Sequence, residues 1–324
     1  MTKIVMTGPT GVGKTSLLAA MYPHLEKHFP GNGYSLVPEP NTKQLLDELA
    51  EKLKKLGEGG TKVTDKQIAG TPQAQEFNFD LVYDNGDTRV TDVNLQIWDI
   101  PGAFCTSNNG LQAQEYLRGS DVSFWCIDSV ALMKGNNEAV NAPTTMANVI
   151  ANSKLNKGHS VCLVLMRSET WEHNGKMGDL FTQLRHQFGS AAATLHGNPN
   201  IGKVYYCSVQ TTGNLHFNSY EGTEPVFIRN AAGAGYAPKH CELPVLCAVR
   251  QSLESVIEAA RREIKRIIDE CFPFTRRCPL MPGHFSYKRN KGLAERLAKR
   301  LAQVSKDVER CLQAEEKSQR LFRW

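Results

Sequence analysis

Apolar runs of strand length recur along the chain, and segments with helical periodicity separate them. A strand that is buried on both faces appears as a continuous apolar run. Such runs lie at residues 3–8, 122–128, 161–166 and 203–209. Helical segments alternate with them, near residues 14–28, 138–154 and 177–189. This alternation predicts an α/β fold in which helices cover both faces of a largely parallel sheet.

Between the first strand–helix unit and the later runs, the pattern changes. Residues 42–57 have apolar side chains at helical spacing, which predicts a further helix. The segment 57–73 is rich in turn-forming residues. Residues 76–83 and 90–100 alternate apolar and polar positions, and the turn 84–87 (DNGD) joins them as a β-hairpin.

The C-terminal part of the chain is mainly helical. Residues 210–243 have no clear period, and we expect them to be irregular. The segment 243–272 predicts one long helix, which the stretch 273–283 interrupts. A last helix is predicted over 290–322. Its apolar residues lie on one stripe: Leu293, Leu297, Leu301, Val304, Val308 and Leu312.

These elements divide the chain into two parts. We expect residues 1–272 to form the α/β domain. Insertions are expected near 31–70 and 211–243 of that domain. Residues 273–324 are expected to form a basic, amphipathic helical extension.

Positive charge is concentrated in that extension. The 324 residues include 38 Lys and Arg against 33 Asp and Glu, a formal net charge of +5. Residues 285–324 alone have a net charge of +6, so the remainder of the chain is nearly neutral. Three interpretations of the last helix remain: it packs on its own domain or on the preceding helix, it pairs with a partner helix, or it lies on an anionic membrane or nucleic acid. Interleaved acidic residues and the lack of interleaved aromatic residues argue against nucleic acid.

The chain has nine cysteines, several of them inside apolar runs. An odd number of cysteines without a signal-peptide pattern predicts reduced thiols in the cytoplasm. No apolar run reaches the about 20 residues that a transmembrane helix needs. Two sets of metal ligands are conceivable, although neither contains a CxxC pair. They are His240 with Cys241 and Cys247, and Cys271 with Cys278 and His284.

The segment Gly8–Thr15 (GPTGVGKT) matches the phosphate-binding pattern G-x-x-x-x-G-K-[ST]. It lies between a predicted strand and a predicted helix, which is the context that the pattern requires. The glycines let the main chain curl so that its N–H groups and the helix N-terminus face the phosphates. Lys14 would contact the outer phosphates, and the Thr15 hydroxyl would bind Mg²⁺. The predicted nucleotide contacts here are Gly8, Thr10, Gly11, Val12, Gly13, Lys14, Thr15 and Ser16.

A second candidate motif follows the hairpin, where an apolar strand ends as WDIPG (98–102). An acidic residue at a strand tip beside a P-loop, here Asp99, binds Mg²⁺ through water, and a nearby glycine N–H contacts the γ-phosphate. The order of P-loop, β-hairpin and W-D-x-x-G resembles the Ras-like GTPases of the translation-factor-related (TRAFAC) class. The resemblance covers about 1–214 and implies a three-layer P-loop NTPase fold with a mostly parallel sheet. It also implies that Gly102 binds the γ-phosphate and that 101–115 is a switch segment.

The same resemblance implies a threonine before the hairpin that closes on Mg²⁺ and the γ-phosphate. Thr71 matches best, and Thr61 and Thr64 are competing candidates. On this basis Lys14 and Thr71 are the predicted catalytic residues. The predicted Mg²⁺ ligands are Thr15, Thr71 and Asp99.

The sequence departs from the family after the third motif. Many Ras-like enzymes have a water-orienting glutamine directly after the glycine, where this chain has Ala103. Because alanine cannot bind a water by hydrogen bonds, either another group orients the water or hydrolysis is slow. Gln112, Gln114 and a group from a partner are the alternatives.

The base-reading motif N/T-K-x-D is also altered, since Met166-Arg167-Ser168-Glu169 stands in its place. The resemblance implies that Arg167 stacks on a purine and that Glu169 accepts hydrogen bonds from guanine N1 and N2. A solvated loop is the alternative. The segment 206–214 resembles the fifth family motif, whose main chain contacts the base, through Ser208 and Val209.

Together these features predict a Mg²⁺-dependent switch that binds and hydrolyses GTP. We expect protein partners at the segments 31–73 and 101–118 and at the C-terminal helix. A nucleotide-binding scaffold with little hydrolysis is one alternative, and a P-loop ATPase or kinase is another. Within the class, residues 8–22 are most similar to bacterial GTPases of conflict or defence gene clusters, the double-GTPase group.

Overall fold

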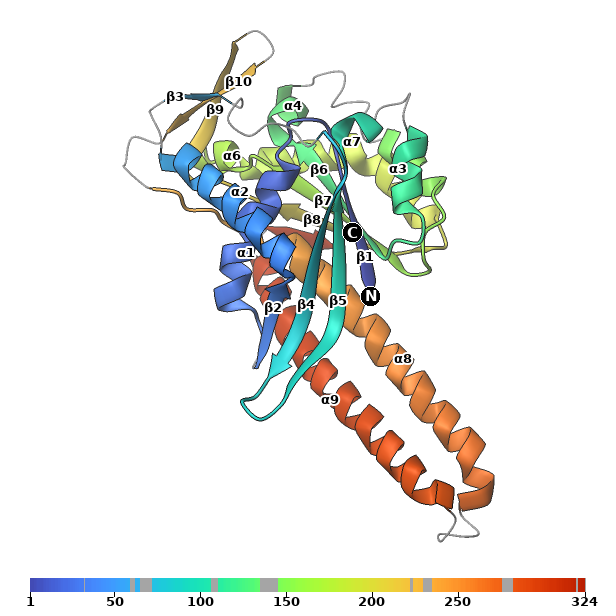
Figure 1. Cartoon of the computed structure of the whole chain (residues 1–324). Coiled ribbons are helices and arrows are strands. Elements are labelled where there is room, and N and C mark those ends of the chain that lie inside the picture. Colours follow the sequence, from blue (N-terminus) through green and yellow to red (C-terminus); the bar gives the residue numbers. More distant parts are fainter. Residues whose placement is uncertain are drawn as a thin grey trace.

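The computed structural model describes most of the chain. The described residues are 1–31, 33–58, 62–64, 72–105, 110–134, 145–221, 224–229, 235–275, 282–318 and 320–323. Five strands run parallel at the centre of the main sheet. They are β1 (Thr2–Thr7), β5 (Arg89–Asp99), β6 (Val122–Asp128), β7 (His159–Met166) and β8 (Ile201–Ser208). The mixed α/β fold expected from the sequence is therefore confirmed (Figure 1).

Antiparallel strands complete both edges of this sheet. On one side β4 (Gln75–Asp84) pairs with β5, and β2 (Tyr34–Pro38) pairs with β4. On the other side β11 (Leu321–Arg323) pairs with β8. In the described part of the chain the sheet has eight strands, in the order β11-β8-β7-β6-β1-β5-β4-β2. The β4–β5 hairpin predicted from the alternating pattern is confirmed.

Helices cover both faces, because successive side chains of a buried strand point to opposite sides. In β1, Ile4 and Met6 belong to one apolar core and Val5 to the other. Helices of the first core are α1 (Lys14–His28), α2 (Pro40–Glu58), α8 (Leu243–Thr275) and α9 (Pro282–Lys317). Those of the second are α3 (Gly110–Leu117), α4 (Ser129–Lys134), the helical residues 145–151 and α7 (Met177–Gly197).

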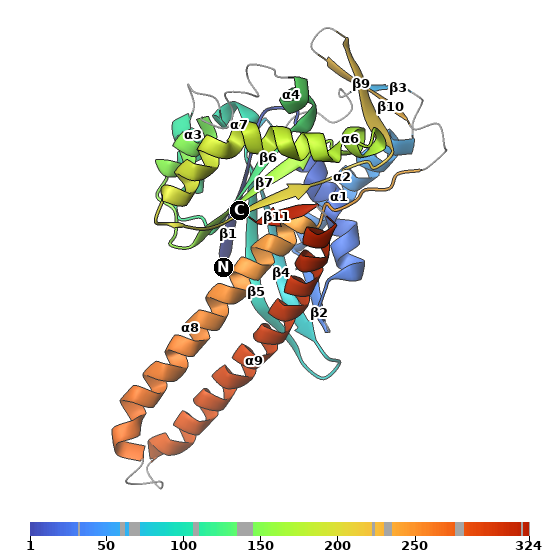
Figure 2. The ribbon, with the colours of Figure 1, turned by 180° about the vertical axis from the view of Figure 1, so that it is seen from behind.

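A small second sheet lies beside the carboxyl ends of the parallel strands (Figure 2). Its strands, in order, are β3 (Lys62–Thr64), β10 (Glu224–Arg229) and β9 (Leu215–Glu221), and the short helix α6 (Glu169–His173) lies beside β9. The expectation that 210–243 is irregular is therefore wrong for β9 and β10. These strands have little apolar alternation, and pairing with the distant β3 stabilises them in place of a local pattern.

The helices α8 and α9 pack against each other as a long antiparallel hairpin that extends away from the sheet (Figures 1 and 2). The stripe residues Leu301, Val304, Val308 and Leu312 are buried in the same core as α8. Packing of the last helix on the preceding one is therefore confirmed, although Leu293 is 50% exposed.

The prediction that this last helix continues to residue 322 is wrong. α9 ends at Lys317, and the chain returns to the sheet as β11. The reason is that Leu321 is fully buried opposite Cys207 of β8, so edge pairing replaces further helix. None of the helices in the described segments is both long and apolar enough to cross a membrane.

Candidate functional site

The candidate site lies where the five parallel strands end. Parallel strands have their carboxyl ends at one edge of a sheet, so the loops after β1, β5, β6, β7 and β8 come together there. In the sheet, β1 lies between β5 and β6. The strands of this sheet that follow β1 in sequence up to β5 lie on one side of it, and β6, β7 and β8 lie on the other side. Such a switch point is where open α/β sheets bind ligands.

The loop Gly8–Thr15 connects β1 to α1, as the sequence predicts. Gly8 has a φ of +139°, and a Cβ there would lie 2.4 Å from the Cys126 carbonyl oxygen of β6. Gly13 precedes α1 with a φ of +100°, and no side chain caps this helix end. No side chain therefore occupies this helix end, and the N-terminus of a helix is a position that attracts anions. In this loop Thr10 and Gly11 are exposed, Val12 is buried in the core, and Ser16 is half-buried in the first turn of α1.

The Lys14 side chain folds back over this loop. Its ammonium group donates hydrogen bonds to the carbonyl oxygens of Gly8 at 3.0 Å and Pro9 at 2.9 Å. Only 7% of the residue is exposed, so the charge is held close to the curled main chain. A phosphate oxygen at this position would form stronger, charge-assisted hydrogen bonds with the same ammonium group.

Thr15, which follows Lys14 in the chain, contacts Asp99 of β5. The Thr15 hydroxyl donates to Asp99 Oδ2 at 2.5 Å, although the two residues are 84 positions apart. Asp99 ends β5 and is fully buried. A hydroxyl and a carboxylate are hard oxygen donors of the kind that Mg²⁺ prefers, so the pair fits this cation.

Gly102 lies against the P-loop main chain. It begins the short 3₁₀ helix η2 (Gly102–Cys105), and a Cβ there would lie 2.2 Å from the Thr10 nitrogen. The position therefore admits only glycine in this arrangement. The Phe104 ring of η2 stacks on the Tyr116 ring of α3, with ring centroids 6.1 Å apart. This contact holds η2 against α3. Ala103 is exposed.

Arg167 connects the loop after β7 to the P-loop. Its guanidinium donates to Asp128 Oδ2 at 2.8 Å and to the Gly11 carbonyl oxygen at 2.7 Å. The same group lies 5.1 Å from the centroid of the Phe227 ring of β10. The sequence analysis missed both Asp128 and Phe227. The position of Asp128 at the end of an apolar strand, as for Asp99, is a signal that would have identified it.

Glu169 is buried next to the loop after β8. Its Oε1 accepts a hydrogen bond from the Thr212 hydroxyl at 3.1 Å, and its buried Oε2 has no hydrogen-bond partner among the described residues. Burial raises the pKa of this carboxyl to about 7, although hydrogen bonds from its own main chain and from Thr212 oppose the shift. Met166 stands where the base-reading motif has a polar Asn or Thr, and its apolar side chain is buried. Its terminal methyl group would lie 3.4 Å from a Cβ at Gly13.

Hydrogen bonds to main-chain carbonyl oxygens hold the loops after β7 and β8 in place. The Val209 carbonyl oxygen accepts a hydrogen bond from the Ser168 hydroxyl at 2.8 Å. The Ser208 N–H donates to the Arg320 carbonyl oxygen at 3.1 Å, directly before β11. Ser208 and Val209 are therefore held between the Met166–Glu169 segment and the C-terminal strand.

Several other candidates lie elsewhere or outside the described residues. Thr71 and Thr61 are outside them, and Thr64 lies in β3 of the small sheet. Gln112 and Gln114 are on α3, where Gln112 is exposed and Gln114 is half-buried.

The structure does not bring together the first of the two conceivable cysteine–histidine ligand sets, which the absence of a CxxC pair already disfavoured. Among the described residues, Cys247 groups with Cys162 and Cys207, and neither His240 nor Cys241 is part of that group. Tertiary packing places the partners of Cys247 on strands that are distant in sequence. In the second set, Cys278 lies outside the described residues.

Comparison with known proteins gives limited similarity. Neither a protein-family model nor a curated protein sequence matches the chain. Similar solved structures include the mammalian SRP receptor, with a TM-score of 0.33 and 12% identity over 64% of this chain and 91% of that chain. Sup35 complexed with GDP has a TM-score of 0.31 and 10% identity over 65% of this chain and 37% of that chain.

The S. cerevisiae Ski7 GTPase-like domain, bound to GDP and inorganic phosphate, is also similar. Its TM-score is 0.32, with 14% identity over 65% of this chain and 43% of that chain. This chain thus spans less than half of the Sup35 and Ski7 chains. Similarity at this level says nothing about the activity of this chain.

Proposed function

We propose that this chain binds a nucleoside triphosphate with Mg²⁺ at the loop after β1. One observation carries the proposal, namely the convergence of the Gly8–Thr15 loop, the Thr15–Asp99 pair and Gly102. The uncapped N-terminus of α1 and the buried Lys14 ammonium group supply positive potential at this point. A triphosphate is the ligand whose charge and length fit this arrangement.

Each group has a defined part in that binding. Lys14 would leave the Gly8 and Pro9 carbonyl oxygens for the outer phosphates, while the loop N–H groups bind the inner ones. Thr15 and Asp99 would hold Mg²⁺, which when bound supplies positive charge that neutralises the phosphate oxygens. The Gly102 N–H would lie next to the terminal phosphate because its main chain already contacts Thr10.

We infer guanine as the preferred base. The support is the buried Glu169 Oε2, which has no hydrogen-bond partner among the described residues, together with the resemblance of this segment to a base-reading motif. An ionised carboxylate accepts hydrogen bonds from guanine N1 and N2, groups that adenine does not offer in the same pattern. The main chain at Ser208 and Val209 would contact the same base.

We propose that hydrolysis is slow and that the chain acts as a switch. Water would attack the terminal phosphate in line, and Lys14 and the loop N–H groups would stabilise the developing charge. Ala103 provides no group to orient that water, so a partner or a glutamine of α3 would have to do so. The same observation favours a second candidate function, a nucleotide-binding scaffold with little hydrolysis.

Partners would contact the segments around the site and the α8–α9 hairpin, which extends away from the sheet (Figure 1). Seven cysteines are free thiols (Cys105, Cys126, Cys162, Cys207, Cys241, Cys247 and Cys311), which supports a reducing compartment such as the cytoplasm. The similarity of residues 8–22 to GTPases of bacterial conflict systems suggests a role in defence.

Competition binding tests this proposal. We expect labelled GTP to bind in the presence of Mg²⁺ and to be displaced by unlabelled GTP at much lower concentration than by ATP. Lys14→Ala should abolish tight binding, whereas Lys55→Ala, which changes an exposed lysine of α2, should not. Unchanged affinity in Lys14→Ala would contradict the proposal, and equal competition by ATP would contradict the guanine preference.

Single-turnover cleavage separates the switch from the scaffold. The switch predicts release of phosphate from bound GTP at a rate above that of free GTP in the same buffer. No product above that background, even with candidate partners present, would favour the scaffold.

A further inference from the structure

Three cysteines from three different elements meet in the core beneath α8. Cys162 lies on β7, Cys207 on β8 and Cys247 on α8. Their sulfur atoms all lie within 4.8 Å of one another, and those of Cys162 and Cys207 are 3.3 Å apart. Each residue is at most 1% exposed. We name these residues the thiol triad.

We infer that the thiol triad is a binding site for one soft, thiophilic metal ion, Cu(I), coordinated by three sulfur atoms. Metal–sulfur bonds are about 2.3 Å long, so three sulfurs around one ion lie about 4 Å apart. The separation of 3.3 Å between Cys162 and Cys207 and the upper limit of 4.8 Å for all three pairs are compatible with this value. An ion would therefore fit after small side-chain adjustments, without movement of the strands or the helix.

The donor set favours Cu(I) over other metals. Within the described residues, no histidine, aspartate or glutamate belongs to the group, so all three ligands are soft sulfurs. Structural Zn²⁺ sites are almost always tetrahedral and need a fourth ligand, and Mg²⁺ and Ca²⁺ need oxygen. Soft thiolates select Cu(I), for which three sulfur ligands are sufficient. Copper enters as Cu(I), so no electron is transferred, and each thiol releases its proton when it binds.

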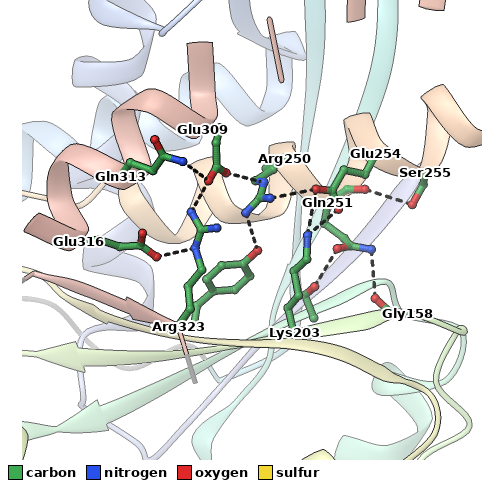
Figure 3. A network of polar contacts seen from close by, with 12 residues as sticks. Gly158, Lys203, Arg250, Gln251, Glu254, Ser255, Glu309, Gln313, Glu316 and Arg323 are labelled. Atoms are coloured by element: carbon green, nitrogen blue, oxygen red, sulfur yellow. Dashed lines mark hydrogen bonds and ion pairs between the residues drawn. The ribbon is translucent and has the colours of Figure 1, made fainter. Parts of the chain in front are cut away.

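A polar network joins α8, α9 and β11 (Figure 3), and its Arg250 and Arg323 lie close enough to Cys247 for their charges to act on it. Arg250 pairs with Glu309 at 2.8 Å and contacts the Tyr205 hydroxyl at 3.4 Å. Arg323 of β11 pairs with Glu309 at 2.7 Å and with Glu316 at 2.5 Å. The Arg250 and Arg323 side chains are 13% and 33% exposed, so the network reaches solvent.

A buried cysteine often serves only as a small apolar core residue. Cys126 and Cys241 are of this kind, because they are buried in the same core but lie outside the triad. They provide matched controls of the same residue type and burial. The triad differs from them in mutual contact and in the nearby charges of Arg250 and Arg323.

The test is an anaerobic titration of the reduced full chain with Cu(I), in competition with a coloured Cu(I) chelator. We expect one Cu(I) per chain to be withheld from the chelator and a sulfur-to-copper charge-transfer band to appear in the ultraviolet. Cys162→Ala, Cys207→Ala and Cys247→Ala should each lose both signals. Cys126→Ala and Cys241→Ala should keep them, as should Cys105→Ala and Cys311→Ala, which remove half-buried thiols.

Wild-type protein gives an independent readout if a triad variant fails to fold. Copper-loaded and copper-free chains are alkylated in urea at a concentration that makes the buried thiols of the copper-free chain accessible, and the modified cysteines are identified by mass spectrometry. We expect copper to protect Cys162, Cys207 and Cys247 together. Complete removal of copper by the chelator, protection of a different set, or tighter binding of Zn²⁺ than of Cu(I) would overturn the inference. None of these outcomes depends on nucleotide binding.

Discussion

Thr15 Oγ1 donates a hydrogen bond to Asp99 Oδ2 at 2.5 Å, which joins the start of α1 to the end of β5. The two strands that precede these residues are neighbours, because β1 pairs in parallel with β5 and Met6 lies opposite Asp99. Parallel register therefore brings a P-loop hydroxyl and a carboxylate together at one edge of the sheet. This is the pair that the proposed Mg²⁺ site needs.

Asp99→Asn tests the role of that carboxylate. The amide has nearly the same shape but no charge, so it should bind Mg²⁺ poorly while the fold is kept. We expect GTP affinity in Mg²⁺ to fall by about tenfold or more, equivalent to about 1.4 kcal/mol. Affinity in EDTA should be the same for both proteins. Asp87→Asn, in the exposed β4–β5 turn, is the control, and an unchanged Mg²⁺ dependence in Asp99→Asn would contradict the assignment.

Gly102→Ala tests the close approach of η2 to the P-loop. A Cβ at this position would lie 2.2 Å from the Thr10 nitrogen, so either η2 or the loop must move. We expect nucleotide affinity to fall by at least tenfold, measured by titration calorimetry. At Gly189 of α7 a Cβ meets nothing within 4 Å. Gly189→Ala should therefore raise the unfolding free energy by about 0.5–1 kcal/mol and leave affinity unchanged.

Glu169 should make GTP affinity depend on pH. Its pKa is raised to about 7, so the carboxylate that would accept hydrogen bonds from guanine is largely protonated at pH 6 and ionised at pH 8. Because the apparent affinity scales with the competent fraction, we expect about a tenfold gain in GTP affinity from pH 6 to pH 8. Glu169→Gln should remove this dependence, whereas ATP binding should show none in either protein. A parallel gain for ATP would disprove base reading by Glu169.

His159 should make the fold less stable in acid. It is fully buried, with Nδ1 2.9 Å from the Ser120 carbonyl oxygen and Nε2 2.9 Å from the Ser123 hydroxyl. Burial lowers its pKa from 6.5 to about 4. Between these pH values the unfolded chain binds a proton that the folded chain does not, so stability is full above pH 6.5 and falls toward pH 4.

The expected loss from this histidine is about 3 kcal/mol, since one pKa unit corresponds to about 1.4 kcal/mol. Urea unfolding at several pH values measures it. His159→Gln should be less stable at pH 7 because its contacts with the two serines change, yet its stability should fall less steeply with acid. If both proteins lose stability equally, a different group is responsible.

Leu321→Ala tests the return of the chain to the sheet. Leu321 is fully buried opposite Cys207, and its loss should cost roughly 2–4 kcal/mol of unfolding free energy. Since the adjacent Arg320 carbonyl oxygen accepts the Ser208 N–H, nucleotide affinity should also fall. Leu293→Ala, at a side chain that is 50% exposed, should cost less than about 1 kcal/mol. Equal effects of the two variants would show that β11 is not a stabilising strand.

Local sequence was sufficient to predict the elements whose formation depends on residues that are close together in the chain. The continuous apolar runs predicted β1, β6, β7 and β8 within a residue or two, because strands buried on both faces must be apolar throughout. Gly8–Thr15 could be located for the same reason, since a phosphate loop needs its glycines and lysine at fixed short spacing.

Tertiary structure decided every feature that joins distant segments. Phe227 reaches Arg167 only because β9 and β10 pair with β3, and nothing in the residues near 227 indicates that pairing. Leu321 falls within the range predicted as helix, yet it pairs with the edge strand β8 as part of β11. Cys162, Cys207 and Cys247 have no shared spacing, and only the packing of α8 on two neighbouring strands brings their sulfurs together. The spacing of residue types along the chain predicts contacts within one helical turn or one strand. Contacts between elements depend on strand order and register, and no short stretch of sequence encodes these.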